Sequence, residues 1–354
     1  MYNTIKKQEI LRWYNLNKKK RYMPWRSTND PYKIWLSEIM LQQTQARTVI
    51  PYYNKWIKKY PTLKSVAKSN IDDLLKIWEG LGYYSRCRNF HKASIKVFED
   101  YNSKIPEDFD LFKELPGVGD YTAGAVLSIA FKKKIPAIDT NILRVMSRIL
   151  GLKERSKSNL NKIKKNMIEY LNTEKPGDIN QALMDLGSMI CKNKDPVCQN
   201  CILQDICKAW EVGEPEGFPA KIKKVAVKKI LMSSGILVDD ELILIAKKKK
   251  GIYREMWQFP SVSIKSSTKE NLIKKKFKEK FGIKIKSMRL IGSFNHLLSH
   301  RNIYVKVYTL SARKTLIESK NFKWIKAKTL NSLPLPNLDK KVFKIFHNYK
   351  DGTE

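Results

Sequence analysis

Long hydrophobic runs are missing from this 354-residue chain. No run of about eighteen apolar residues occurs, so no membrane-spanning helix is expected. The first residues, Met1 to Glu9, have no apolar core of signal-peptide length. Cysteine is scarce as well: there are five, an odd number, and four are clustered, which does not fit the disulfide framework of a secreted protein. We therefore expect a cytoplasmic protein.

Acidic residues are few compared with basic ones. The chain has 34 Asp and Glu against 69 Lys and Arg, a formal net charge of +35. A balance this basic favours a polyanionic partner, most simply nucleic acid. Lys, Ile and Asn are plentiful throughout, as in proteins from AT-rich genomes, so the charge supports this interpretation without proving it. A hydrophobic content of 42% is enough for real cores, and the length favours two domains.

Helical periodicity dominates up to about residue 210. Asp30 and Pro31 form a typical helix start, with Asp as N-cap and Pro at the first helical position. After the clustered cysteines the pattern changes. Residues 213–219 are rich in Gly and Pro, residues 236–238 and 242–246 predict a hairpin, and a helix at about 269–281 lies among further strands at 284–294 and 302–310. The sequence thus predicts a helical domain at 1–212, a linker at 213–229 and an α+β domain at 230–354.

The stretch from Leu115 to Val126 predicts a glycine turn followed by a buried helix. Gly117 and Gly119 are expected in a tight turn, where the missing Cβ permits a positive φ and a close approach of another backbone. A turn with free N–H groups ahead of a helix N-terminus is suited to holding a phosphate. An ordinary corner between two helices is the simpler alternative when such a turn stands alone.

The clustered cysteines are Cys191, Cys198, Cys201 and Cys207, in the spacing C-x6-C-x2-C-x5-C. Four thiolates in so short a loop can surround one metal centre, either zinc or an iron–sulfur cube. Zinc sites usually pair two C-x-x-C knuckles, and only one is present here. Cys87 lies outside this set and is expected to be a buried or idle thiol.

Two carboxyl groups are candidates for chemistry. Glu38 stands among the apolar residues Trp35, Ile39 and Leu41, so it should lose hydration and have a raised pKa, as a general acid at neutral pH requires. Asp139 precedes a helix, where it could merely be an N-cap, or it could stabilise a developing positive charge.

Together these motifs resemble the helix–hairpin–helix DNA glycosylases, and most closely the MutY-type adenine DNA glycosylases, over essentially the whole chain. The resemblance implies an all-α domain with a helix–hairpin–helix at about 111–131 and a [4Fe-4S] loop at 191–207, followed by an α+β Nudix-like (MutT-like) domain. It implies a monomeric base-excision repair enzyme of the bacterial cytoplasm, associated with the nucleoid. Its substrate would be double-stranded DNA, from which it removes adenine paired with 8-oxoguanine or guanine.

The resemblance also implies catalytic roles. Glu38 would protonate adenine at N7, because neutral adenine is a poor leaving group. Asp139 would stabilise the oxocarbenium-like sugar, with Asn141 orienting the water and the carboxylates. Tyr121 stands where endonuclease III-type enzymes have the lysine that forms a Schiff base, so base removal without efficient strand scission is expected.

DNA contacts follow from the same comparison. Gln43 would enter the base stack, Thr44 would contact the opposite base and Tyr83 would stack beside it. In the second domain only Glu279 remains of the acidic residues that bind metal in Nudix hydrolases, which predicts that this domain recognises DNA and does not hydrolyse a substrate. In the family it recognises 8-oxoguanine through a Phe-Ser-His loop, and the matching residues here are Leu298, Ser299 and His300. The remaining predicted DNA contacts are Arg26, Arg86, Arg88, Gly117 and Gly119.

Two alternatives remain at this point. An endonuclease III-like bifunctional glycosylase/lyase is disfavoured by Tyr121 and by the additional C-terminal domain. A non-catalytic DNA-damage binding protein is disfavoured because Glu38 and Asp139 are both present.

Overall fold

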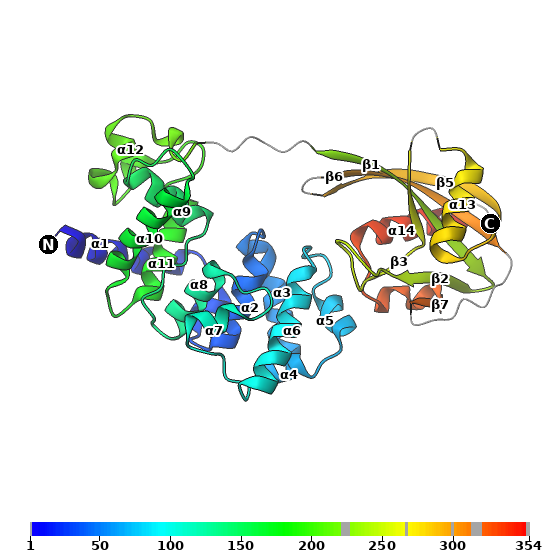
Figure 1. Cartoon of the computed structure of the whole chain (residues 1–354), viewed down its shortest axis with the longest axis horizontal. Helices are drawn as coiled ribbons and strands as arrows, with labels where there is room; N and C mark the ends of the chain where they lie inside the picture. Colours follow the sequence, from blue (N-terminus) through cyan, green and yellow to red (C-terminus); the bar gives the residue numbers. More distant parts are fainter. Residues whose placement is uncertain (1, 221–226, 266–267, 299–300, 313–320, 352–354) are drawn as a thin grey trace. The chain divides into compact units, whose positions relative to one another are not determined.

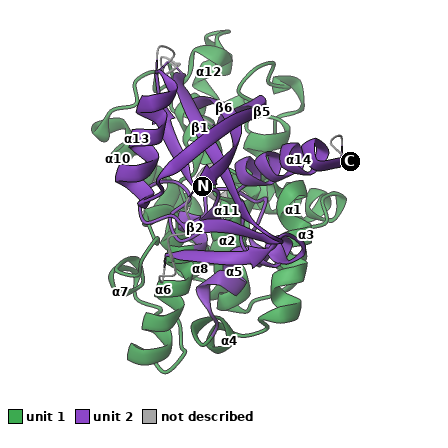
Figure 2. Ribbon diagram, turned by 90° about the vertical axis from the view of Figure 1, so that its right-hand side faces the viewer, with its two compact units in different colours: residues 1–68, 88–223 green, residues 69–87, 224–354 purple. Residues whose placement is uncertain are grey.

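The computed structural model describes residues 2–220, 227–265, 268–298, 301–312 and 321–351. The chain divides into two compact units (Figures 1 and 2). The first is formed by Met1–Lys68 and Arg88–Lys223, and the second by Ser69–Cys87 and Lys224–Glu354. No helix in the described part of the chain is both long and apolar enough to cross a membrane.

Among its described residues the first unit contains helices and loops but no strand, as the periodicity predicts. Three short 3₁₀ turns lie in or beside its cysteine loop, and two others span Lys18–Lys20 and Pro24–Ser27. Its helices are α1 (Tyr2–Asn17), α2 (Pro31–Leu41), α3 (Ala46–Lys59), α4 (Leu63–Ala67), α6 (Ser85–Asp100, which begins in the second unit), α7 (Phe109–Lys113), α8 (Asp120–Ala130), α9 (Thr140–Ile149), α10 (Lys157–Leu171), α11 (Pro176–Met189) and α12 (Lys208–Glu211).

Helix α2 is fixed at its start and on its buried face. The Asp30 carboxylate accepts a 2.9 Å hydrogen bond from the Tyr32 backbone N–H, which caps the helix as expected. Trp35, fully buried, meets the edges of Phe90 in α6 and Phe112 in α7, with ring centroids 4.9 and 5.2 Å apart. Aromatic pairs in this edge-to-face geometry add to the burial free energy. One turn after Trp35 the same helix carries Glu38.

A second cluster of buried side chains joins α1, α9, α10 and α11. It packs Ile10 and Tyr14 of the first helix against apolar residues of the other three, and the cysteine loop rests on it through Cys191, Cys201 and the buried Leu203. The loop therefore depends on this core for its position. The core consists of Ile10, Tyr14, Ile142, Val145, Met146, Ile149, Ile163, Met167, Tyr170, Leu171, Ile179, Ala182, Leu183, Leu186 and Leu203.

The second unit is built on a mixed sheet of seven described strands in the order β3-β2-β1-β6-β5, with β4 paired to β1 and β7 paired to β2. Strands β1 and β6 are parallel over ten residue pairs, from Lys228↔Arg301 to Leu237↔Leu310, and the other pairs are antiparallel. The strands are β1 (Lys228–Asp239), β2 (Leu242–Lys247), β3 (Trp257–Gln258), β4 (Ser261–Ile264), β5 (Ile285–Leu298), β6 (Arg301–Ala312) and β7 (Phe322–Lys326).

Helices cover both faces of this sheet. Alternation along a strand sends neighbouring side chains to opposite faces. Ile243 and Ile245 pack with α14 (Asn337–Asp351), whereas Leu244 and Ala246 pack with α13 (Glu270–Phe281). The predicted hairpin, helix and two later strands are confirmed, and α14 is an element that the sequence analysis did not predict. The remaining helix of this unit is α5 (Ile71–Ile77), from the segment 69–87.

The glycine turn joins α7 to α8. Gly117 has φ +83°, and a Cβ there would lie 2.8 Å from Asn89 Cβ, so the position requires glycine. The expectation of a positive φ at Gly119 is wrong: its φ is −109° and ψ 177°, because it is the extended N-cap of α8. A Cβ at Gly119 would meet nothing within 4 Å, so this backbone is open to a partner, and no side chain caps the helix end.

Gly124 predicts a stability effect that can be measured. A Cβ at this position of α8 would overlap the carbonyl oxygen of Pro136, which belongs to the chain segment leading to Asp139. Replacing Gly124 with alanine should therefore destabilise the protein by about 1–3 kcal/mol through overpacking. The control, Gly119→Ala, should cost less than about 1 kcal/mol, the loss of a weak N-cap. Urea unfolding measures both, and equal stabilities of the two variants would contradict the close approach.

Candidate active site

Glu38 and Tyr121 form the centre of the site. The side chain of Glu38 is 6% exposed, and the Tyr121 hydroxyl in α8 donates a 2.6 Å hydrogen bond to Glu38 Oε2. Burial raises the pKa of Glu38 to about 7; the bond from Tyr121 and the charge of Arg26 oppose this rise, and the charge of Asp139 adds to it. The raised pKa expected from the apolar neighbours of Glu38 is thus present in the structure.

Asp139 is both a helix cap and a site residue. Its Oδ1 accepts a 2.7 Å hydrogen bond from the Ile142 backbone N–H at the start of α9, and its Oδ2 accepts one of 2.7 Å from Asn141 Nδ2. Burial raises the pKa of Asp139, and these donors and the charge of Arg144 oppose the rise. The site therefore contains two carboxyl groups whose pKa is raised by burial.

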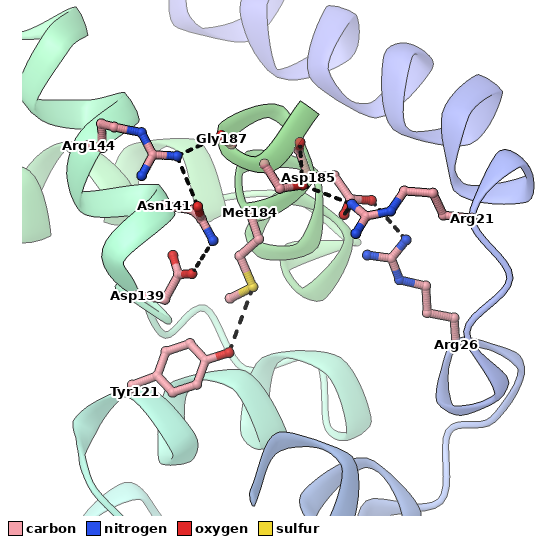
Figure 3. A network of polar contacts seen from close by, with 10 residues as sticks. Arg21, Arg26, Tyr121, Asp139, Asn141, Arg144, Met184, Asp185 and Gly187 are labelled. Atoms are coloured by element: carbon pink, nitrogen blue, oxygen red, sulfur yellow. Dashed lines mark hydrogen bonds and ion pairs between the residues drawn. The ribbon is translucent and has the colours of Figure 1, made fainter. Parts of the chain in front are cut away.

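A chain of polar contacts leads from Asp139 through Asn141 to Arg144 (Figure 3), and Arg144 also reaches the cysteine loop. Asn141, which binds Asp139, accepts a 2.9 Å hydrogen bond from Arg144 Nη2. The same nitrogen donates to the Gly187 carbonyl at 2.6 Å, and Arg144 Nε donates to the Cys191 carbonyl at 2.8 Å. Arg144 thereby ties α9 to the end of α11 and fixes the side chain that orients Asp139.

The segment before Asp139 is held by a buried asparagine. Asn180 in α11 is fully buried and accepts a 3.1 Å hydrogen bond from the Ala137 backbone N–H. Its amide donates to the Ile135 carbonyl at 3.0 Å and to Ser128 Oγ at 2.9 Å. A buried amide whose donors and acceptor are all bound specifies one backbone path. Along that path the chain reaches Asp139 in the site. The sequence analysis did not identify Asn180 as a residue that supports the site.

Arg26 lies close to the site but is engaged with protein groups. Its Nη1 lies 2.8 Å from Asp185 Oδ2, near enough for an ion pair although the N–H direction does not meet hydrogen-bond geometry. Arg21 Nη1 lies 3.0 Å from Oδ1 of the same carboxylate (Figure 3). The Arg26 guanidinium lies 5.5 Å from the ring centroid of Tyr14. Asp185 is 4% exposed, and its place among the apolar residues of α11 was the signal that could have revealed it.

The turn after α2 carries two predicted DNA contacts. Gln43 is exposed and has φ +57°, a left-handed conformation uncommon for a residue with a side chain. Thr44 follows with its backbone N–H bonded to the Leu41 carbonyl at 3.0 Å. Gln42 Nε2 donates to Thr122 Oγ1 in α8 at 3.3 Å, which anchors the turn next to the helix that carries Tyr121. Strained backbone of this kind often occurs at functional sites.

In the second unit, Tyr83 has the left-handed φ of +47° and is 39% exposed. The guanidinium of Arg86 lies 5.4 Å from the ring centroids of both Tyr83 and Trp78, and burial lowers its pKa to about 10. Arg86 is thus part of the support for Tyr83. Arg88, another predicted DNA contact, lies in the first unit, where only 8% of the residue is exposed. Ser299 and His300 lie outside the described residues.

The four cysteines are close enough to influence one another. Burial raises the pKa of Cys198, Cys201 and Cys207, that of Cys201 to about 11, and the charges of neighbouring cysteines contribute to each rise. Arg148, 2% exposed, donates to Cys191 Sγ at 3.2 Å and to the Lys192 carbonyl at 2.7 Å. A cationic donor of this kind suits a thiolate ligand of a metal centre.

Within the described residues, no three His, Cys, Asp or Glu side chains are arranged to hold a single metal ion.

Comparison with known proteins agrees with this architecture. The profile of the HhH-GPD superfamily of base excision DNA repair proteins matches residues 36–169, and that of the NUDIX domain matches residues 234–344. Adenine DNA glycosylases of two Buchnera aphidicola subspecies are similar: the one from Baizongia pistaciae is 34% identical over 90% of this chain and 89% of its own, and the one from Schizaphis graminum is 32% identical over 96% and 98%. The structure of a thermostable thymine-DNA glycosylase aligns with 59% of this chain and 97% of its own, with 30% identity and a TM-score of 0.55.

The buried Glu38 predicts a pH-dependent stability. Between its ordinary pKa of 4.5 and the folded-state value of about 7, the folded protein keeps a proton that the unfolded chain has lost. The free energy of unfolding should therefore fall as pH rises through this window, by on the order of 3 kcal/mol from this group. Glu38→Gln removes the effect, so the variant should gain stability relative to wild type as pH rises from 5 to 8.

Urea unfolding at both pH values measures that difference. The exposed Glu169→Gln, in α10, serves as the control and should retain the wild-type pH dependence. If Glu38→Gln also retained it, Glu38 would have an ordinary pKa and the description of the site would be wrong.

Proposed function

The chain belongs to the adenine DNA glycosylases and is an N-glycosylase of base-excision repair; from this premise we propose that it removes adenine mispaired with 8-oxoguanine or guanine by hydrolysing the N-glycosidic bond. The observation that carries the proposal is the buried pair of Glu38 and Tyr121 beside Asp139. It combines a proton donor and a second carboxyl group in one site, and the departure of a neutral purine requires both a proton and a nearby carboxylate.

The first step uses the proton of Glu38. With a pKa of about 7, a substantial fraction of this carboxyl is protonated at neutral pH. It donates that proton to N7 of adenine, so the base that accepts the electron pair of the breaking C1′–N9 bond leaves as a neutral molecule rather than as an anion. Tyr121, whose hydroxyl is bonded to Glu38, keeps the carboxyl oriented toward the base.

The second step uses the charge of Asp139. As the glycosidic bond breaks, positive charge develops on the sugar, and a nearby carboxylate stabilises it. The hydrogen bonds from Ile142 N–H and Asn141 orient Asp139 for this role. A water then attacks C1′ and gives up a proton to Glu38, which became a carboxylate when it protonated the base, and an abasic site is left. Because Tyr121 has no amine, no Schiff base forms there, and the strand remains intact.

Recognition of the duplex combines charge, turns and one loop. The net charge of +35 favours binding to the phosphate backbone, and the open Gly119 N-cap of α8 suits a phosphate. Gln43, Thr44 and Tyr83 then occupy the stack and contact the base opposite the extruded adenine. Ser299 offers an acceptor to the N7–H that distinguishes 8-oxoguanine from guanine, and the family resemblance assigns His300, the next residue in the sequence, to the same recognition.

A [4Fe-4S] cluster fits the cysteine loop. The ligands would be Cys191, Cys198, Cys201 and Cys207, with Arg148 donating to the sulfur of the first. When bound, the cluster would supply covalent cross-links that order the loop, which has few apolar residues of its own. Arg144 and Arg148 would then act on a fixed segment.

The direct test of this function is single-turnover base release by wild type and Glu38→Gln. Wild type should release adenine from A:8-oxoguanine and A:G duplexes, and the strand should break only after alkali. Glu38→Gln keeps the shape of the side chain but has no acidic proton, so the rate should fall by about 10²–10⁴-fold while duplex binding persists.

Glu169→Gln is the control and should release adenine at the wild-type rate. Strand scission without alkali would indicate the bifunctional endonuclease III-like alternative. Binding without any base release would indicate a non-catalytic DNA-damage binding protein.

The cluster predicts a loss of iron in one variant only. Protein purified anaerobically should contain about four irons per chain. Cys198→Ser should lose iron and DNA affinity together, because the loop loses its order. Cys87→Ser changes a fully buried thiol outside the set and should keep its iron. Analysis of the iron and zinc content per chain, together with the visible absorption spectrum, measures these outcomes. A stoichiometric amount of zinc without iron would refute the cluster.

A further inference from the structure

Residues 69–87 lie within the chain of the helical domain but belong to the second unit. The segment begins with α5, whose N-cap is Asn70, and its first turn holds Asp72. Both carboxylate oxygens of Asp72 accept hydrogen bonds from Lys247 Nζ, at 2.8 and 3.1 Å, and Oδ2 also accepts one from Trp257 Nε1 at 3.3 Å. Lys247 and Trp257 pair across β2 and β3, so the start of α5 is fastened to that edge of the sheet.

Glu79 fastens the other end of α5. Its side chain is 7% exposed, and Oε1 accepts a 2.9 Å hydrogen bond from the Leu335 backbone N–H. Its Oε2 lies 2.7 Å from Lys76 Nζ and 3.0 Å from Lys340 Nζ in α14. A carboxylate this buried that receives two ammonium groups and one backbone donor makes a specific contact, because loss of its charge leaves both cations unpaired.

The turn that follows Glu79 is stabilised by contacts between its own residues. Trp78 Nε1 donates to the Gly82 carbonyl at 3.0 Å, and Arg86 Nη2 donates to the same oxygen at 3.3 Å. The Arg86 guanidinium lies over the rings of Trp78 and Tyr83. These contacts hold Tyr83 in its left-handed conformation with its ring partly exposed. The position of the ring is therefore set by the segment that Asp72 and Glu79 attach to the sheet.

A second connection runs from this turn to the end of β5. The ring of Tyr84 lies 6.2 Å from that of Tyr253, at an interplanar angle of 63°. The Tyr253 hydroxyl lies 3.3 Å from His296 Nε2, in a buried hydrogen bond. His296 stands on β5 two residues before Leu298, which packs on the apolar core of the sheet and is followed in the sequence by Ser299 and His300.

We propose that Asp72, Glu79, Tyr253 and His296 are positioning residues that fix the Tyr83 turn and the end of β5 in one body, and so determine how well the enzyme distinguishes 8-oxoguanine from guanine. The inference rests on the function proposed above, which assigns Tyr83 and Ser299 to recognition of the DNA. The two bases differ by one carbonyl and one N–H, so their discrimination depends on contacts placed within a fraction of an ångström.

Glu79→Gln is the sharpest test, because it keeps the acceptor for the Leu335 N–H and removes the charge between two lysines. We expect the ratio of single-turnover rates, A:8-oxoguanine over A:G, to fall at least about threefold, within the range of a single stacking or edge contact. The matched control is Glu279→Gln, an exposed residue of α13 in the same unit that lies 3.9 Å from Lys275. It should leave the ratio unchanged.

A merely structural role of Glu79 predicts a different result. Partial unfolding would lower the burst amplitude, which measures the active fraction, on both duplexes alike and would leave the ratio of rates unaltered. A positioning role acting through Tyr83 also predicts that Glu79→Gln has no further effect in a Tyr83→Ala background. Additive effects of the two substitutions would contradict that route.

Tyr253→Phe provides a second variant if Glu79→Gln does not fold. It removes the hydroxyl that contacts His296 but keeps the ring that contacts Tyr84. It should also lower the ratio of the single-turnover rate on A:8-oxoguanine to that on A:G. Unchanged ratios in both variants, with a normal preference in wild type, would overturn the inference and leave the proposed function intact. A wild-type enzyme with no preference for 8-oxoguanine would overturn that part of the proposed function and the inference with it.

Discussion

The burial of one carboxyl group against one hydroxyl is the constraint on which the site depends. Glu38 loses its hydration in α2 and keeps a single short contact, from Tyr121 in α8. This contact requires the two helices to be placed accurately. Trp35 locks α2 against neighbouring aromatic rings, and Gly124 lets α8 come against the segment that leads to Asp139. A proton donor at neutral pH is thus a product of packing, obtained at some cost in stability.

The second carboxyl is oriented by hydrogen bonds. Asp139 has its oxygens occupied by Ile142 N–H and Asn141, and Asn141 is in turn held by Arg144. Since Arg144 also binds the backbone of Cys191, the order of the cysteine loop and the orientation of Asp139 are linked. Burial raises the pKa of both carboxyl groups, and hydrogen-bond donors oppose the rise at each.

Features encoded by neighbouring residues could be predicted from the sequence. The Asp30 cap, the burial of Glu38 and the hairpin at 236–246 follow from short patterns, and the structure has each of them. Features that join distant segments could not be predicted: the partners Asp185 and Arg26 are 159 positions apart in the chain, and no periodicity links them. Gly119 was assigned the wrong backbone because a Gly-x-Gly pattern does not reveal which glycine needs the positive φ.

The protonation state of Glu38 tests this account most directly. Infrared difference spectroscopy of wild type against Glu38→Gln isolates the carbonyl band of a single protonated carboxyl group, without dependence on substrate binding. The account predicts a band that is present at pH 6, disappears with a midpoint near pH 7 and is absent from the variant. A midpoint near the ordinary value of 4.5 would show that burial does not hold the proton on Glu38, and the proposed acid would have to be another group.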